Sequence, residues 1–440
     1  MAHSQTNHPS SGGSDHYGRI LILIVVGLPC LWIYNHLDEI IGFAYNNFVT
    51  IGLIIFGLIW IGILFIKSKM KTNLKKDRVS NLAKVWNTKN GVYLGTTTDN
   101  VEIHLPDVTR TGHVQIIGAT GRGKTESLIL PMLMRDLHRG KSAVLIDGKG
   151  DQELAERIQG YSTMLPKKLK PIIFDLGDLY NSAVTNPLRE GTAQQITDRL
   201  FAAFEFKEEY YKSVQYEITS VIVELIHDQK REVTFKLLFD LFMSDEKLTE
   251  LMSKSKNDFL TSRLVQWLSD SRRERDQKIT GITSQLGPLA KGEISKLVNG
   301  EVFGREFFSL SKHLTNKGQE QFAIVILLPT LLYQELAFKL GKLLLQEVAW
   351  SVAARKEKVF TPIYLDEFSS FVYPGFLGIL NKAHSIGIAL HLSHQSLGDL
   401  EMVSPEFAKA INANTNVKCL LGLNDPMTAV FFAKHLGTGK

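Results

Sequence analysis

The segment from Gly118 to Thr125 is the part of this 440-residue chain whose residue types and spacing point most directly to chemistry. It fits the pattern G-x-x-x-x-G-K-[ST] at every fixed position. The glycines of such a loop let backbone N–H groups surround phosphate oxygens, and the positive end of a following helix adds to the attraction. The segment therefore predicts a P-loop that binds ATP through Gly118, Ala119, Thr120, Gly121, Arg122, Gly123, Lys124 and Thr125.

Two side chains at the end of this loop are expected to act on the phosphates. Lys124 can reach the β- and γ-phosphates as a point charge, and the Thr125 hydroxyl can ligate Mg²⁺. The apolar run Val114–Ile117 precedes the loop, and a helical pattern follows it. A glycine-rich turn without a ligand is the alternative, which the strand, loop and helix context disfavours.

An acidic pair supplies the second half of the predicted site. The apolar run Phe360–Leu365 ends in Asp366 and Glu367, which is the form of a Walker B strand. Asp366 is placed to bind Mg²⁺, directly or through water, and Glu367 to polarise the attacking water. A plain solvated turn would also end in such a pair, but a complete P-loop in the same domain favours the catalytic interpretation.

Other polar residues follow predicted strands and carry weaker signals. Gln395 comes after the strand Ile388–Ser393, where it can contact the γ-phosphate or the water; a glutamine bonded to loop backbone is the alternative. The segment Asp147–Asp151 ends another strand, at the edge where open α/β sheets bind ligands, and a glycine turn with solvated charges stays open. Asn186-Pro187 predicts a turn without chemistry.

Basic residues also gather further along the chain, at Arg272, Arg273, Arg275 and Lys278. They could contact phosphate backbones. Acidic residues interleave with them at helical spacing, namely Asp270, Glu274 and Asp276. A salt-bridged, solvated helix face is therefore favoured over a nucleic-acid contact.

The elements that must position these residues alternate between strand and helix. Further apolar strands are predicted at 143–147, 171–175, 322–328 and 417–423, with helices near 153–159, 332–354 and 378–384. This alternation predicts an α/β fold with a parallel sheet covered on both faces. From Thr192 to about Leu314 the period is helical, which predicts an all-α domain inserted into the sheet domain.

The N-terminal part has a different character. Residues 1–18 are rich in Ser, His and Gly and are predicted to be disordered. Two apolar runs then predict two transmembrane helices, at about 19–36 and 48–66. The short loop between them carries Asp38 and Glu39, whereas a run of Lys and Arg follows residue 66, which places the main domain in the cytoplasm. A signal peptide and a pair of buried helices are the alternatives.

These patterns divide the chain as follows: 1–18, a disordered cytoplasmic N-terminus; 19–66, a membrane hairpin; 67–110, a basic connector with short strands; 111–190, the first part of the P-loop core; 191–316, the all-α domain; and 317–440, the second part of the core. The formal charge of +5 is too small to argue for nucleic acid. Cys30 and Cys419 are the two cysteines, and they suggest no disulfide framework.

The assembled pattern resembles the TraD/TraG family of conjugative coupling proteins of type IV secretion. The shared features are the two N-terminal spans, His113 before the P-loop, Asp147–Asp151, Asn186-Pro187-Leu188 before a helical insertion, Leu365–Phe368, and Gln395-Ser396. The P-loop occurs in many ATPases, but the membrane hairpin together with the helical insertion is more specific. The resemblance extends over nearly the whole chain.

The resemblance implies a RecA-like core in an ATPase of the bacterial inner membrane that assembles as a hexamer. Such a protein receives a relaxase-bound single strand of DNA from the relaxosome and drives it into the channel proteins of the secretion system. The helical domain is expected to face the cytoplasm and meet the relaxosome. Two rival functions remain: an FtsK-like duplex translocase, and a receptor whose ATPase serves the docking of protein cargo.

Two departures from the family pattern matter. Many relatives place an arginine, offered to the neighbouring subunit's nucleotide, where this chain has His384. Neutral histidine lacks the permanent charge of an arginine finger, so we expect another base, with Lys382 as the candidate. Relatives also usually continue beyond the position at which this sequence stops, Lys440.

Overall fold

The structure is a computed structural model, and it describes residues 28–46, 56–62, 64, 91–98, 100, 102–315 and 320–436. The chain divides into two compact units, residues 1–81 and 82–440. Each unit is described by itself.

The first unit contains helices α2 (Leu28–Asn35) and α3 (Leu37–Asn46) and a further helical stretch at 56–62. The residues predicted to form the loop between the spans are helical in the structure, since Asp38 and Glu39 form the first turn of α3. Acidic side chains stabilise a first turn through the helix dipole, which accounts for the difference. Among the described residues, no helix combines the length and the apolar character needed to cross a membrane. Residues 19–27, 48–55, 63 and 65–66 of the predicted spans lie outside the described residues.

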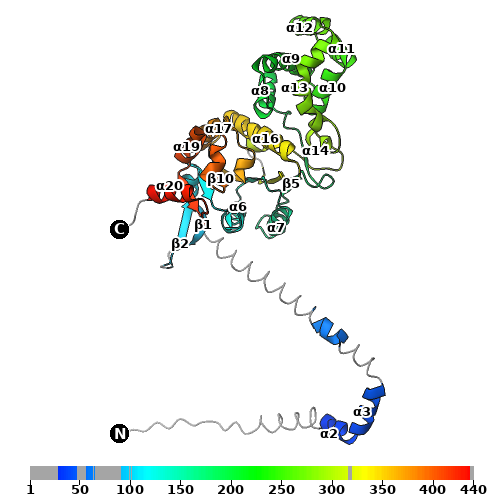
Figure 1. The fold of residues 1–440 in the computed structure, drawn as a ribbon, viewed down its shortest axis with the longest axis vertical. Coiled ribbons are helices and arrows are strands. Elements are labelled where there is room, and N and C mark those ends of the chain that lie inside the picture. The colour runs from blue at the N-terminus through cyan, green and yellow to red at the C-terminus, as the bar shows by residue number, and fades with distance from the viewer. Residues whose placement is uncertain are drawn as a thin grey trace. The chain divides into compact units, whose positions relative to one another are not determined.

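A seven-stranded parallel sheet forms the centre of the second unit (Figure 1). Its strand order is β11 (Val417–Leu420), β3 (Val114–Ile117), β10 (Ile388–His394), β9 (Thr361–Asp366), β4 (Ala143–Asp147), β8 (Ala323–Leu327) and β5 (Ile172–Asp175). Strand β10 thus separates the P-loop strand from the Walker B strand. The parallel α/β sheet predicted from the alternation of strands and helices is confirmed.

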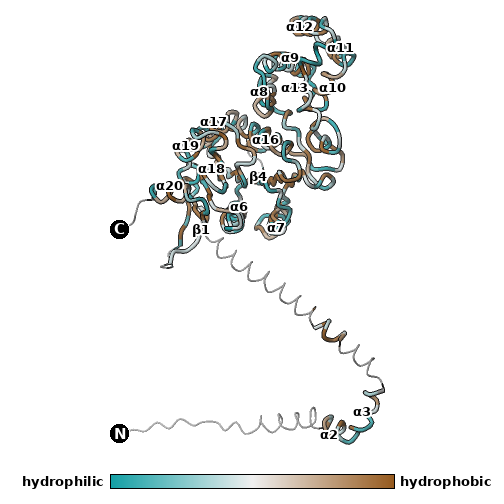
Figure 2. Tube along the Cα trace, in the orientation of Figure 1, coloured by the Kyte–Doolittle hydropathy of each residue, from teal (hydrophilic) through white to brown (hydrophobic). Residues whose placement is uncertain are grey.

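Helices cover both faces of this sheet because its strands are apolar on both sides. Val144 and Ile146 belong to a core shared with α16 (Gln334–Ala354) and the inserted helices, whereas Ala143 and Leu145 pack in a second core with α6 (Leu130–His138) and α7 (Gln152–Ser162). Successive side chains of a strand alternate between faces, so each strand contributes to both cores. Figure 2 shows the hydrophobic residues around β4, in the interior of the unit.

A helical insertion leaves the sheet after the short strand β6 (Val184–Thr185) and returns at its parallel partner β7 (Phe307–Phe308). Its helices are α8 (Ala193–Ala203), α9 (Glu209–Asp228), α10 (Phe235–Met243), α11 (Asp245–Ser253), α12 (Asp258–Ser269), α13 (Arg272–Ala290) and α14 (Ser295–Val298). Hydroxyl and amide side chains cap most of them, as at Thr192 and Ser271. The domain limits 191 and 316 stay a prediction.

The remaining elements surround this core. A hairpin of β1 (Gly91–Thr96) and β2 (Glu102–Pro106) leads through α5 (Asp107–Arg110) to the P-loop strand. Helix α15 (Leu310–Thr315) bonds to α16, since the Ser311 hydroxyl donates to Glu347 over 2.9 Å. Helices α17 (Phe376–Ala383), α18 (Leu397–Glu401), α19 (Pro405–Asn414) and α20 (Pro426–Leu436) complete the second half.

Candidate nucleotide-binding site

The P-loop follows β3 at the carboxyl edge of the sheet. Gly121 and Gly123 have φ angles of +75° and +81°, a region in which a side chain is strained. A Cβ at Gly123 would also lie 2.8 Å from the hydroxyl of Ser127. The exposed turn Thr120–Arg122 therefore has the tight shape that lets backbone N–H groups face a phosphate.

Lys124 holds its charge inside this loop. Its side chain is buried, and Nζ donates to the carbonyl oxygen of Gly118 over 2.7 Å. The loop is also tied to the segment after β11, because the Ala119 N–H donates to the carbonyl of Gly422 over 3.0 Å. The ammonium group consequently stands at the centre of the turn, where the phosphates of a nucleotide would bind.

The helix after the loop begins with a wide turn of the π type, Lys124–Ile129, and continues as α6. The Leu130 N–H donates to the carbonyl of Thr125, five residues back. Pro131 follows at once and has no N–H to donate, so the regular ladder cannot form at this point. Wide turns of this kind are frequent at functional sites.

Thr125 and Asp366 meet at the end of the loop. The Thr125 hydroxyl donates to one carboxylate oxygen of Asp366 over 2.5 Å, and the other oxygen accepts from the Ser393 hydroxyl over 2.6 Å. The Glu367 N–H donates to that second oxygen over 3.0 Å. A hydroxyl beside a buried carboxylate is an oxygen donor set that fits Mg²⁺. The two residues predicted to hold the metal are thus side by side.

Glu367 follows on a strained backbone. Its φ angle is +50°, which is uncommon outside glycine and asparagine and often marks a functional position. Its carboxylate accepts a hydrogen bond from the Gln395 amide over 3.4 Å. Gln395 is in turn fixed by its N–H, which donates to Asp399 over 2.8 Å. The structure therefore brings Gln395 to Glu367, and Glu367 next to Asp366.

Asp147 lies beside this group, in register with Asp366 on the neighbouring strand. It is buried, and its oxygens accept the N–H groups of Lys149 and Asp151 over 3.1 and 2.8 Å. Burial raises the pKa of Asp147 to about 7, and the charge of Asp366 adds to the rise. The segment Asp147–Asp151 therefore lies at the predicted edge of the sheet, and its buried titratable group is Asp147.

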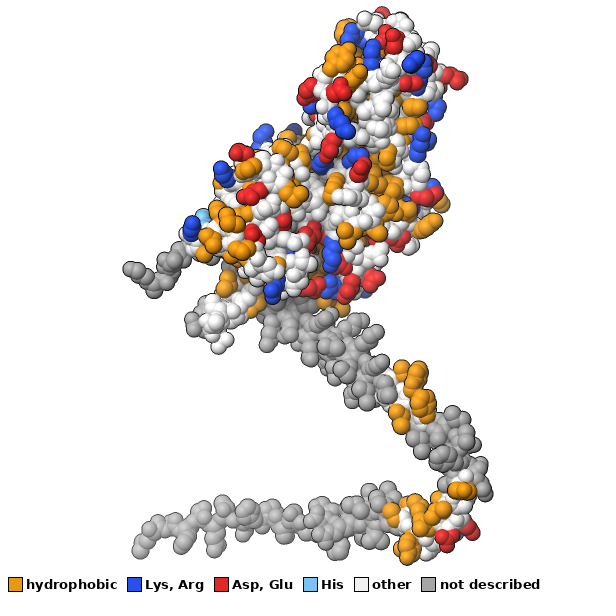
Figure 3. Space-filling view, in the orientation of Figure 1, with side chains coloured by type: hydrophobic (Ala, Val, Ile, Leu, Met, Phe, Trp, Pro, Cys, Tyr) orange, Lys and Arg blue, Asp and Glu red, His pale blue; other side chains and the backbone are white. Residues whose placement is uncertain are grey.

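The basic cluster of the insertion forms ion pairs within the insertion. Arg275 bonds to Asp245 over 2.6 Å, Arg272 to Asp276 over 2.9 Å, and Lys278 to Asp270 over 2.7 Å. The predicted salt-bridged face is confirmed for Arg272, Arg275 and Lys278. Figure 3 shows the same pattern more widely, with both signs of charge interspersed over the inserted helices.

Lys382 and His384 do not join the phosphate-binding residues. Both are exposed and precede β10, at the amino edge of the sheet, whereas the P-loop follows β3 at the carboxyl edge. His113, which precedes β3 at that amino edge, contacts the same region by a 2.8 Å hydrogen bond between its ring and the Leu380 carbonyl. Lys382 is thus remote from the P-loop of its own subunit.

Sequence reasoning missed two features of the site. Ser393 holds Asp366, and its only signal was a hydroxyl at the end of the predicted strand Ile388–Ser393. A buried polar network beneath the site joins Arg110, Asp136, Tyr364 and His391, and it had no signal at all, because its members are far apart in sequence.

A family described as the TraM recognition site of TraD and TraG matches residues 362–440 of this chain. The type 4 coupling protein DotL of Legionella pneumophila is 24% identical over 395 residues, a match covering 74% of this chain and 49% of the relative. The chain therefore spans about half the length of that curated relative.

Solved structures of similar fold include the plasmid coupling protein TrwB and VirB4 of Thermoanaerobacter pseudethanolicus. TrwB in complex with a non-hydrolysable GTP analogue has a TM-score of 0.55 and 17% identity, covering 81% of each chain. TrwB with ADP and Mg²⁺ has a TM-score of 0.51 and 16% identity, covering 76% of this chain and 74% of that one. VirB4 has a TM-score of 0.53 and 16% identity, covering 80% and 89%.

At these identities the structures bear on the fold, which is the RecA-like α/β fold of the coupling proteins. The family match and the sequence match with DotL add similarity along the chain itself. The resemblance indicated by the motifs is confirmed: this chain is similar to the type IV coupling proteins in both sequence and fold.

Proposed function

We propose that this protein is a membrane-anchored ATPase that couples relaxosome-bound single-stranded DNA to a type IV secretion channel and drives its transfer. The observation that carries the proposal is the contact of Thr125 with Asp366 across the end of the P-loop, with Glu367 and Gln395 beside it. Similarity to coupling proteins supplies the biological setting.

Each residue of the site has a distinct role in this proposal. Lys124 neutralises the β- and γ-phosphates, and the backbone N–H groups of the loop bind their oxygens. Thr125 and Asp366 hold Mg²⁺, which when bound offsets the negative charge that builds up during phosphoryl transfer. Glu367 accepts a hydrogen bond from the attacking water, and Gln395 keeps the Glu367 carboxylate in place.

Nucleotides and the metal come to this chain by analogy with TrwB, whose solved complexes contain ATP and GTP analogues and ADP with Mg²⁺. The oxygen donors of Thr125 and Asp366 and the ammonium of Lys124 fit both groups. The partners in this proposal are a relaxase, single-stranded DNA, the channel proteins, and five further copies of the chain in a hexamer.

The decisive test is ATP hydrolysis by the purified full chain with and without single-stranded DNA. We expect Mg²⁺-dependent hydrolysis that single-stranded DNA stimulates more than duplex DNA does. A Lys124→Ala variant prepared in parallel controls for contaminating ATPases. A rate of ATP hydrolysis that DNA does not change, together with capture of a relaxase by the inserted helices, would instead support a receptor for protein cargo.

The membrane hairpin, 19–36 and 48–66, has a separate test. A reporter that is active only outside the cytoplasm should work when fused near Glu39 and fail when fused after Arg78. The reverse pattern would overturn both the charge argument and the cytoplasmic placement of the ATPase.

A further inference from the structure

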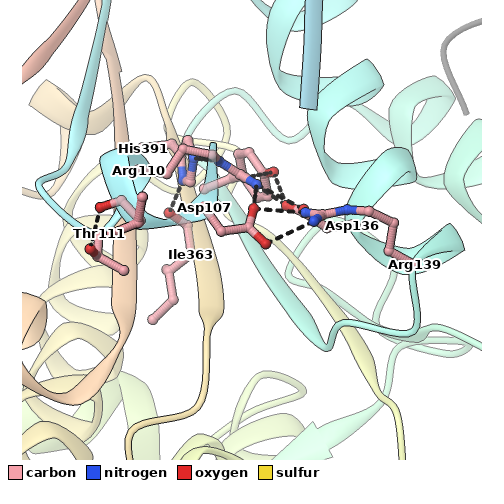
Figure 4. A network of polar contacts seen from close by, with 9 residues as sticks. Asp107, Arg110, Thr111, Asp136, Arg139, Ile363 and His391 are labelled. Carbon is pink, nitrogen blue, oxygen red and sulfur yellow. Dashed lines mark hydrogen bonds and ion pairs between the residues drawn. The ribbon is translucent and has the colours of Figure 1, made fainter. Parts of the chain in front are cut away.

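Figure 4 shows a network of charged and polar side chains that includes Arg110, Asp136 and His391, all of them buried. Arg110 is fully buried and donates to both carboxylate oxygens of Asp136, over 2.8 and 2.6 Å. It also donates to the Tyr364 hydroxyl over 2.7 Å and to a ring nitrogen of His391 over 3.1 Å. A last bond joins it to Asp107 over 3.1 Å, so every N–H direction of the guanidinium is used.

The acceptors of this network are saturated as well. Asp136 accepts from Arg110, from Arg139 over 2.5 Å and from the Tyr364 hydroxyl over 2.6 Å. Burial and the charge of Arg110 hold the pKa of His391 well below its ordinary value. The ring is therefore neutral, with one nitrogen accepting from Arg110 and the other facing the Ile363 carbonyl at 3.4 Å.

The network repeats the arrangement of the site one step below it. In the upper layer, the helix after the P-loop contributes Thr125, β9 contributes Asp366 and β10 contributes Ser393. In the lower layer the same three elements contribute Asp136, Tyr364 and His391, with Arg110 between them. Tyr364 and His391 each precede their upper neighbour by two residues, so they lie on the same face of their strands.

We propose that Arg110, with Asp136, positions the metal-binding oxygens of Thr125 and Asp366. Both are positioning residues, because they act through the elements that carry the site and do not contact the nucleotide. A buried ion pair is weak evidence of a stabilising role, since apolar residues could fill the same space. What this network adds is a fixed alignment of α6 on β9 and β10. This inference rests on the proposed ATPase function.

The mildest test removes one hydroxyl. Tyr364→Phe keeps the ring, whose centroid lies 4.3 Å from that of His391, and deletes the bonds to Arg110 and Asp136. The full chain would be titrated with a fluorescent ADP analogue at increasing Mg²⁺ concentrations and in EDTA. We expect the half-saturating Mg²⁺ concentration to rise roughly threefold to tenfold, less than for a direct partner of a metal ligand. Nucleotide binding in EDTA should match that of the wild type.

Tyr161→Phe is the matched control, since Tyr161 packs against the same core as Tyr364 and should leave the Mg²⁺ requirement unchanged. Asp136→Asn, a stronger perturbation, should raise that requirement further in whatever fraction folds. A Tyr364→Phe protein that melts at a lower temperature but keeps the wild-type Mg²⁺ requirement would overturn this inference and leave the proposed function untouched. A wild-type chain that binds no nucleotide at any Mg²⁺ concentration would overturn the proposed function as well.

Discussion

Asp147 and Asp366 end neighbouring parallel strands in the same register, and both are buried. The Asp366 carboxylate accepts hydrogen bonds from the hydroxyl groups of Thr125 and Ser393, whereas the Asp147 carboxylate accepts them only from backbone N–H groups. Burial, with the charge of Asp366, raises the pKa of Asp147 from 3.8 to about 7. The pKa of Asp147 therefore differs between the folded and the unfolded protein.

This difference predicts how stability changes with pH. Between pH 3.8 and about 7 the folded protein keeps a proton on Asp147 that the unfolded chain has released. The free energy of unfolding therefore falls as pH rises through that window, by at most about 4 kcal/mol for this group. Asp147→Asn cannot titrate at this position. In urea unfolding, the free energy of unfolding of the variant should therefore rise relative to that of the wild type from pH 5 to pH 8. A wild-type-minus-variant difference that stays constant with pH would contradict the assignment.

Lys124 and Glu367 should separate binding from hydrolysis. Lys124→Ala removes the charge that faces the phosphates and should abolish nucleotide binding. Glu367→Gln keeps the shape of the side chain and leaves Thr125 and Asp366 in place, so ATP should still bind while turnover falls roughly a hundredfold or more. Filter binding of labelled ATP and steady-state hydrolysis measure the two effects. Wild-type turnover by Glu367→Gln would show that the Walker B assignment is wrong.

Ser393 is expected to matter through Asp366. Ser393→Ala deletes the 2.6 Å hydrogen bond to one carboxylate oxygen and leaves that buried oxygen with a backbone donor only. The affinity for Mg²⁺ in the presence of ADP should fall roughly tenfold, as for other partners of metal ligands. Ser351→Ala is the control, because that buried hydroxyl bonds only within its own helix α16. Equal Mg²⁺ affinities for the two variants would exclude the role given to Ser393.

Much of the fold follows from local patterns in the sequence. Apolar runs bounded by turns identify the strands, and the P-loop and the acidic pair identify two of the residues that meet at the site, Thr125 and Asp366. The last strand is shorter than its apolar run suggests. It ends at Leu420, and Gly422 turns its carbonyl toward the P-loop. A local pattern cannot show where a neighbouring loop interrupts a strand.

Local sequence patterns could not predict the contacts between segments that are distant in the sequence. Asp270 and Asp276 were identified as partners of the basic cluster from helical spacing, but Asp245 of α11, which bonds to both Arg272 and Arg275, was not. Arg110 and His391 are 281 positions apart and meet only because β10 lies next to β3. Residues of this kind become visible only once the strand order is known.

The position of Lys382 leads to a last prediction, about a site shared between subunits. Lys382 lies at the amino edge of the sheet and its own P-loop at the carboxyl edge, so it can serve only the nucleotide of another copy. Negative charge develops on the γ-phosphate in the transition state, and Lys124 neutralises it from one side only. A second cation is needed on the opposite side of that phosphate. Lys382→Ala should therefore lower turnover while leaving ATP binding intact, and Lys409→Ala, at an exposed lysine of α19, should change neither.

Mixing two inactive proteins makes this prediction specific. Lys124→Ala subunits cannot bind ATP but still offer Lys382, whereas Lys382→Ala subunits bind ATP but lack the donated charge. Co-assembled in one oligomer, they should regain part of the wild-type turnover, and this recovery should disappear on dilution to concentrations at which subunits separate. If the mixture is no more active than its two components, Lys382 is not the residue that completes the neighbouring site.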